Sequence, residues 1–175
     1  LSSLVNIVTD SKNAVSVDDL TNYYTDGLSD ILTELGLQTE IIDNRIKGGP
    51  PFLIGKRIES SELKTILLYG HGDTVPLQEG QWFEEIIPNE LKVIGDKIYG
   101  RGVADNKGQH LINLLALLSV LKIRKKLGFN LKIIFEMGEE IGSPGLFDLC
   151  EKYKDYFKSD VLIASDGPRV AVDVP

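Results

Sequence analysis

Residues 65–73 read Thr-Ile-Leu-Leu-Tyr-Gly-His-Gly-Asp, an apolar run that leads into a histidine and an aspartate set between glycines. The run predicts a buried strand over 64–69, with His71 and Asp73 in the loop that follows it. Loops at the carboxyl ends of strands are where open α/β sheets assemble their sites. A neutral imidazole there can bind a metal, and a carboxylate two residues further on can hold the ring in place. Taken alone, the sequence His-Gly-Asp at 71–73 is a weak indication of a metal site, because most loop histidines are solvated or make structural hydrogen bonds.

Strands and helices alternate along most of the remaining sequence. Apolar residues at helical spacing predict helices, and short apolar runs predict strands. The expected helices are 16–35, 107–127 and 143–157. The expected strands are 39–42, 52–58, 64–69, 131–137 and 161–164, with a hairpin over 92–99. This alternation predicts an α/β fold, a three-layer sandwich around a central mixed, largely parallel sheet.

Three expectations concern burial and helix ends. Residues 111–121 are almost entirely apolar, so the helix over 107–127 and the strand over 161–164 are both expected to be buried. Pro144 is expected in the first turn of its helix, where a missing amide costs nothing. Cys150, the only cysteine, excludes an internal disulfide and is expected to be a buried, inert thiol.

Length and charge narrow the class of protein. A chain of 175 residues can bury one substantial core. Its net charge of -7 argues against nucleic acid and against an anionic membrane surface as partners. No apolar run is long enough to span a bilayer and no signal peptide is visible, so a cytoplasmic protein is expected. The chain starts with Leu1 and stops at Pro175, and both ends are interpreted as cut.

Further acidic residues follow other expected strands or the hairpin, and glycines flank each of them. They are Asp105, the adjacent pair Glu139 and Glu140, and Asp166. Glycine lets the backbone bend sharply and approach closely. Carboxylates and an imidazole gathered at one sheet edge would repel one another unless water, protonation or divalent cations relieved the charge. One histidine with several acids on tight loops favours cations and matches zinc-type ligation.

Each acidic residue also has a simpler interpretation. Glu139 and Glu140 are typical of a solvated pair, Asp105 of a helix cap, and Asp166 of a turn residue before glycine. Their joint occurrence at strand ends argues against these separate interpretations. Two adjacent acids cannot easily aim at one point, so one of the pair can bind metal while the other acts as a general base on a metal-bound water.

Four ordered motifs together resemble the M20 family of metallopeptidases, which has carboxypeptidase, dipeptidase and acetylornithine deacetylase-like members. The motifs are 70–73, 100–108, 139–143 and 165–167. The resemblance implies a zinc exopeptidase-like catalytic domain, of which residues 1–175 are the N-terminal part. It also implies that a lid or dimerisation domain, and a C-terminal return segment with a further histidine ligand, are absent from this chain.

The resemblance assigns roles to individual residues. His71 and Asp166 would bind one zinc, Asp105 would bridge two zincs, and Glu140 would bind the second. Glu139 would be the general base, and Asp73 would orient or tune His71. The family usually has a cis peptide after the bridging aspartate, so a cis bond is expected between Asp105 and Asn106. Cobalt or manganese could replace zinc, and the other histidine, His110, is interpreted as a helix-face residue rather than a ligand.

The implied activity is metal-dependent hydrolysis of an amide bond in a dipeptide or short peptide, by a dizinc-bound hydroxide with Glu139 as base. Residues 105–109 resemble the dipeptidase branch slightly more than the deacetylases. The alternatives are an N-acyl-amino-acid deacylase of the same family and a non-catalytic metal-binding fragment. The parent protein is expected to form a homodimer through the missing lid, and this fragment alone is expected to be inactive. Of its two metal sites, the one with three protein ligands, His71, Asp105 and Asp166, is expected to be better occupied.

Overall fold

The computed structural model describes residues 1–12 and 16–167, and a five-stranded mixed sheet forms its centre. The strand order is β1-β2-β6-β3-β7. The strands are β1 (Gln38–Ile42), β2 (Phe52–Arg57), β6 (Asn130–Glu136), β3 (Thr65–His71) and β7 (Val161–Ala164). β3 pairs in parallel with β6 and β7, whereas β2 pairs antiparallel with β1 and β6. The carboxyl ends of β6, β3 and β7 therefore meet at one edge.

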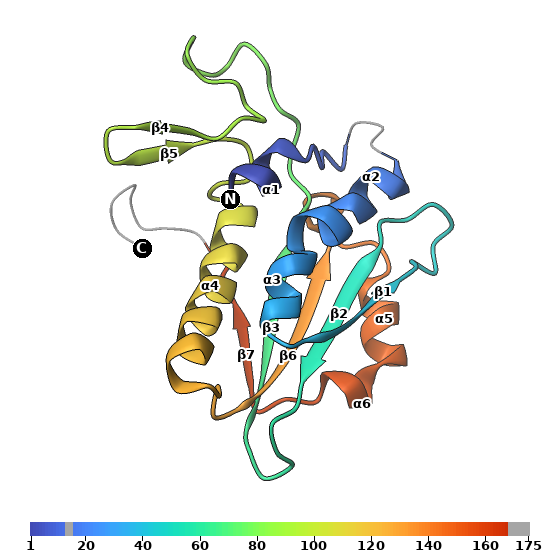
Figure 1. Ribbon diagram of the computed structural model, residues 1–175. Helices are drawn as coiled ribbons and strands as arrows, with labels where there is room; N and C mark the ends of the chain where they lie inside the picture. The colour runs from blue at the N-terminus through green and yellow to red at the C-terminus, as the bar shows by residue number, and fades with distance from the viewer. Residues whose placement is uncertain (13–15, 168–175) are drawn as a thin grey trace.

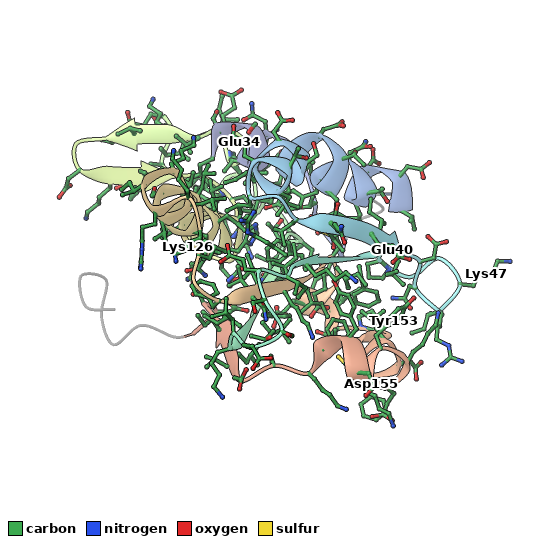
Figure 2. The ribbon with its side chains drawn as sticks, turned by 60° about the horizontal axis from the view of Figure 1, so that its bottom comes forward. Glu34, Glu40, Lys47, Lys126, Tyr153 and Asp155 are labelled. Carbon is green, nitrogen blue, oxygen red and sulfur yellow. The ribbon has the colours of Figure 1, made fainter. Side chains whose placement is uncertain are left out.

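Helices cover both faces of the sheet and confirm the predicted three-layer α/β sandwich (Figure 1). The first layer is formed by α2 (Val17–Asn22), the π-helical η1 (Tyr23–Leu28), α3 (Ser29–Glu34) and α4 (Lys107–Arg124), and α1 (Ser2–Asn6) adjoins it. The second layer is formed by α5 (Leu146–Lys152) and α6 (Lys154–Phe157). Figure 2 shows Glu34 at the end of α3 and Asp155 of α6 on opposite sides of the sheet.

Two apolar clusters fill the space between the layers. Ile133 and Phe135 of β6 point into the cluster beneath α2–α4, whereas Ile134 points into the cluster beneath α5 and α6. Successive residues of a strand face opposite sides, so a strand covered on both faces is apolar at nearly every position. The two-sided burial of β6 explains the continuous apolar run that marks it in the sequence.

The predicted helix over 16–35 is built in three pieces. Ser16 caps α2, and its Oγ accepts from the main-chain N of Asp19 at 3.1 Å. The π-helical η1 then replaces α-helical turns in the middle of the segment. The first two residues of η1, Tyr23 and Tyr24, both lie in the core, 0% and 2% exposed. Isolated π-helical turns of this kind occur frequently near functional sites.

Two burial predictions were wrong. α4 buries only one face: Leu114 is fully buried, whereas Ile112 is 66% exposed. In the described part of the chain, no further layer packs against the apolar residues on the outer face of α4. All four side chains of β7 are exposed. Within residues 1–12 and 16–167, β7 is one of the two edge strands of this sheet and pairs only with β3.

The C-terminal helical region also differs from the prediction. α5 begins at Leu146, and Pro144 lies in the turn before it rather than in its first turn. A break at Tyr153 separates α5 from α6. A third burial prediction was also wrong: Cys150 is exposed, because it lies on the outer side of α5 while Leu149 points inward. The remaining pieces are the hairpin of β4 (Lys92–Ile94) and β5 (Lys97–Tyr99) and the 3-10 turn η2 (Glu139–Ile141). Among the described helices, none combines the length and hydropathy needed to cross a bilayer.

Candidate metal centre

Three side chains converge at the edge where the parallel strands end. His71 is the last residue of β3, Asp166 lies two residues beyond β7, and Asp105 lies in the turn before α4. One ligand atom from each lies within 4.8 Å of the other two. His71 Nε2 is 2.9 Å from Asp105 Oδ1 and 3.5 Å from Asp166 Oδ2. Parallel pairing of β3 and β7 brings His71 and Asp166 together, as predicted from their positions after strands, and the turn before α4 places Asp105 beside them.

The His71 ring is fully buried and its orientation is set by Asp73. Nδ1 lies 3.1 Å from the main-chain oxygen of Asp73 and 3.2 Å from its Oδ1. Both atoms accept, so Nδ1 carries the hydrogen and donates it. The other nitrogen, Nε2, is thereby directed at Asp105 and Asp166. Metal-binding histidines typically have this arrangement, with one nitrogen held by an oxygen and the other free to ligate.

Asp73 also holds the turn that carries the two glutamates. Its carboxylate is fully buried. Oδ1 accepts from the main-chain N of Glu139 at 3.2 Å, and Oδ2 accepts from the main-chain N of Glu140 at 3.1 Å. One carboxylate thus joins the loop after β3 to the η2 turn after β6. The sequence indicated only the contact between Asp73 and His71.

The two glutamates have different positions in the site. Glu139 Oε2 lies 3.9 Å from His71 Nε2, and the Glu139 side chain is 39% exposed. Burial raises the pKa of Glu139; the charge of His71 opposes this rise, and neighbouring carboxylates add to it. Burial and the charge of Asp105 raise the pKa of Glu140. In the described part of the chain Glu140 is not among the three residues whose ligand atoms converge.

The charge balance of the cluster fits a cation. Burial disfavours a charged His71, but hydrogen bonding and charge from Asp73, with the charges of Asp166 and Asp105, raise its pKa to about 9. Without a cation the cluster therefore retains a proton on its imidazole. One imidazole nitrogen with carboxylate oxygens is a donor set that suits zinc, cobalt or manganese. The residues present thus fit a divalent metal.

Asn106 is a buried residue of this region that was not among the predicted site residues. The peptide bond between Asp105 and Asn106 is cis, as predicted. Asn106 Oδ1 lies 3.4 Å from the main-chain N of His71, and Nδ2 donates to the main-chain oxygen of Ser165 at 2.7 Å. The signal in the sequence is its position directly after Asp105, but an uncharged amide is not itself typical of a metal ligand or a general base.

His110 is not one of the converging residues, in line with its interpretation as a residue of the helix face. It lies on the buried side of α4, and Nε2 is 2.7 Å from the Tyr23 hydroxyl. Burial, with the positive charges of His71 and Lys107, lowers the pKa of His110 to about 3. The imidazole is therefore neutral.

Two glycines beside His71 allow this close packing. A Cβ on Gly70 would lie 2.8 Å from the Cβ of His110. A Cβ on Gly72 would overlap the ring of Tyr23. These glycines are thus needed for the close approach of α4 and η1 to the end of β3, one of the two roles expected for glycine here.

Comparison with known proteins gives consistent matches to peptidases. The model of the peptidase family M20/M25/M40 matches residues 67–173. The Beta-Ala-His dipeptidase of Mus musculus is 34% identical over 150 residues, which cover 79% of this chain and 30% of that protein. The cysteinylglycine-S-conjugate dipeptidase of Corynebacterium striatum is 35% identical over 146 residues, covering 82% of this chain and 31% of that protein.

The fold has matches among solved structures. The structure of human carnosine dipeptidase 1 matches with a TM-score of 0.85 at 30% sequence identity. The match covers 95% of this chain and 37% of the human one. The chain thus spans about a third of the length of the proteins that it matches.

Proposed function

Because the chain belongs to the peptidase family M20/M25/M40, we propose that the whole protein is a metal-dependent dipeptidase. The observation that carries the proposal is the convergence of His71, Asp105 and Asp166 within 4.8 Å beside an accessible glutamate. Two relatives are named as dipeptidases, one for β-Ala-His and one for cysteinylglycine-S-conjugates, and these names support a dipeptide substrate. A non-catalytic metal-binding fragment would need no general base beside the ligands, so the presence of Glu139 there argues against that alternative.

The cluster would hold its metal with side chains already in place. His71, Asp105 and Asp166 would bind one divalent cation through the converging atoms. Asp105 would be shared with a second cation, together with Glu140, and the remaining ligand would come from elsewhere in the whole protein. A bound zinc would polarise the scissile carbonyl and lower the pKa of the attacking water. Cobalt or manganese would suit the same donors.

Glu139 would move the proton during amide hydrolysis. Its carboxylate is accessible from solvent and lies beside the converging ligands, 3.9 Å from His71 Nε2. It would take the proton from the attacking water and give it to the leaving nitrogen. A carboxyl group whose pKa is raised is a better base, and it is also better able to return the proton near neutral pH. Asp73 is fully buried and would act by positioning His71 and the glutamate turn.

The proposal can be tested by assaying the whole protein on dipeptides and N-acetyl amino acids, after chelation and after reloading with zinc, cobalt or manganese. Dipeptide hydrolysis should disappear on chelation and return with metal. Hydrolysis of N-acetyl amino acids alone would instead identify a deacylase that uses the same centre. Activity that survives complete chelation would refute metal dependence.

The role of the base can be tested separately. Glu139→Gln should lower kcat by about 10²–10⁴-fold, because it removes the proton acceptor. Metal content should be retained, since the three converging ligands are unchanged. Glu151→Gln, which alters an exposed glutamate of α5, is the matched control and should leave kcat unchanged. A Glu139→Gln enzyme as active as this control would show that another group takes the proton.

A further inference from the structure

A chain of buried polar side chains lies directly behind the ligand-bearing loops. It consists of Tyr23 from η1, His110 from α4 and Asn106 at the start of α4. Each of the three is at most 1% exposed. None of them has a part in the hydrolysis proposed above, so their burial beside the metal cluster calls for a separate explanation.

Two main-chain groups determine the orientation of the Asn106 amide. The main-chain oxygen of Ser165 can only accept, so the side-chain atom 2.7 Å from it is the donor Nδ2. The main-chain N–H of His71 can only donate, and the atom 3.4 Å from it is the acceptor Oδ1. This second contact is long, but both point to the same orientation.

The orientation of the amide then determines the tautomer of His110. Asn106 Oδ1 also lies 3.1 Å from His110 Nδ1, which must therefore carry a hydrogen and donate it. A neutral imidazole has a single N–H group, so Nε2 accepts. The hydroxyl of Tyr23, 2.7 Å from Nε2, is the donor. Every hydrogen bond in the chain from Tyr23 to Ser165 thus has one direction.

Asn106 connects the segments that carry all three converging ligands. Its oxygen faces the main chain of His71, its nitrogen binds the residue before Asp166, and its own main chain follows Asp105. We propose that Tyr23, His110 and Asn106 are positioning residues that set the spacing of the three metal ligands. The inference rests on the proposed metal centre, because without a bound cation the spacing has no function.

The packing around Tyr23 limits the freedom of its ring. Lys107 Nζ lies 5.2 Å above the ring centroid and donates to the main-chain oxygens of Leu4 and Ile7 at 2.9 and 2.7 Å. Gly72 leaves room for the Cδ1 and Cε1 atoms of the ring. The hydroxyl is therefore presented to His110 by a ring held between α4 and the loop after β3.

Neighbouring tyrosines offer a matched pair of variants. Tyr23→Phe and Tyr24→Phe each remove one buried hydroxyl from η1. The Tyr24 hydroxyl has one hydrogen to share between the main-chain oxygens of Phe135, at 2.9 Å, and Pro51, at 3.1 Å, and neither acceptor belongs to the chain that leads to Asn106. Both variants should lower stability, but only Tyr23→Phe should disturb the metal ligands.

The measurement uses cobalt(II) as the probe on the whole protein, with its dissociation constant and its visible absorption spectrum as readouts. Tyr23→Phe should weaken cobalt binding by about 10-fold or more and alter the spectrum, because loss of a residue behind the ligands typically costs 10–100-fold in affinity. Tyr24→Phe should remain within about two-fold of wild type in affinity. Equal effects of the two variants, or none, would overturn the positioning role.

A second pair keeps the test decisive if Tyr23→Phe fails to fold. His110→Asn retains a side-chain N–H near the place of Nδ1, whereas His110→Leu removes both nitrogens. His110→Asn should recover part of the cobalt affinity that His110→Leu loses. Identical affinities in these two variants would contradict the inference. Wild-type protein that binds no cobalt would instead overturn the proposed metal centre itself, and the two failures are thus distinguishable.

Discussion

Replacing Asp73 by asparagine tests whether one buried carboxylate holds both parts of the metal centre. The carboxylate accepts from His71 Nδ1, Glu139 N and Glu140 N at 3.1–3.2 Å. Asparagine keeps one accepting oxygen and turns an NH₂ group toward a main-chain N–H. A buried donor without an acceptor costs about 1–3 kcal/mol. The two remaining hydrogen bonds would lose their charge assistance, at about 1 kcal/mol each.

The expected loss in unfolding free energy is therefore about 3–5 kcal/mol. For a domain of this size that corresponds to a fall in Tm of roughly 10 °C. The substitution also removes the repulsion between Asp73 and the other carboxylates. This gain offsets little of the loss in unfolding free energy, because the attraction between Asp73 and His71 is removed as well. The effect is large beside the 5–15 kcal/mol that typically separates folded from unfolded protein.

Urea denaturation of the metal-free protein, followed by far-ultraviolet circular dichroism, measures this change. Asp160→Asn is the matched control, because its exposed carboxylate also accepts a main-chain N–H, from Thr65 at 2.8 Å, and pairs with Lys64. Its midpoint should stay close to wild type, since solvent replaces the lost contacts. If Asp73→Asn unfolded at the same urea concentration as Asp160→Asn, the claim that Asp73 anchors the glutamate turn would be refuted.

Other changes have equally definite outcomes. Burial lowers the pKa of His71, but nearby carboxylates raise it to about 9 in the metal-free protein. Zinc binding at pH 7 should therefore displace about one proton from His71. Calorimetry in buffers of different ionisation enthalpy measures the number of protons released. The folded pKa lies above the unfolded value of about 6.5, so the stability that His71 contributes to the metal-free protein should be complete below that pH and fall as the pH rises through 9. Gly72→Ala should lower the unfolding free energy by about 1–3 kcal/mol in urea denaturation, because the new Cβ overlaps the buried Tyr23 ring. Leu114→Ala should cost about 2–5 kcal/mol in the same measurement, whereas Leu115→Ala, at a position 47% exposed, should cost about 0.5 kcal/mol or less.

Local pattern was sufficient to predict the layers of this fold and the cluster at their edge. Apolar runs and helical spacing identify the strands and helices, because side-chain periodicity follows directly from backbone geometry. Parallel strands have their carboxyl ends on one side, so His71 and Asp166 could be expected together from their positions after strands, whereas Asp105 follows the hairpin and reaches them through the turn before α4. The cis bond before Asn106 followed from the family resemblance and not from local pattern.

Partners across long stretches of chain were decided only by the tertiary structure. The Tyr23 hydroxyl meets an imidazole 87 residues away, and the Asn106 amide meets the carbonyl of a residue 59 positions later. Periodicity marks Tyr23 as buried but is silent on what its hydroxyl binds, because that partner depends on how two layers dock. The exposure of β7 has the same origin, since a strand's apolar composition does not reveal which neighbours it has. Sequence therefore determined which side chains could do chemistry here, and packing between distant segments decided which atoms hold them in place.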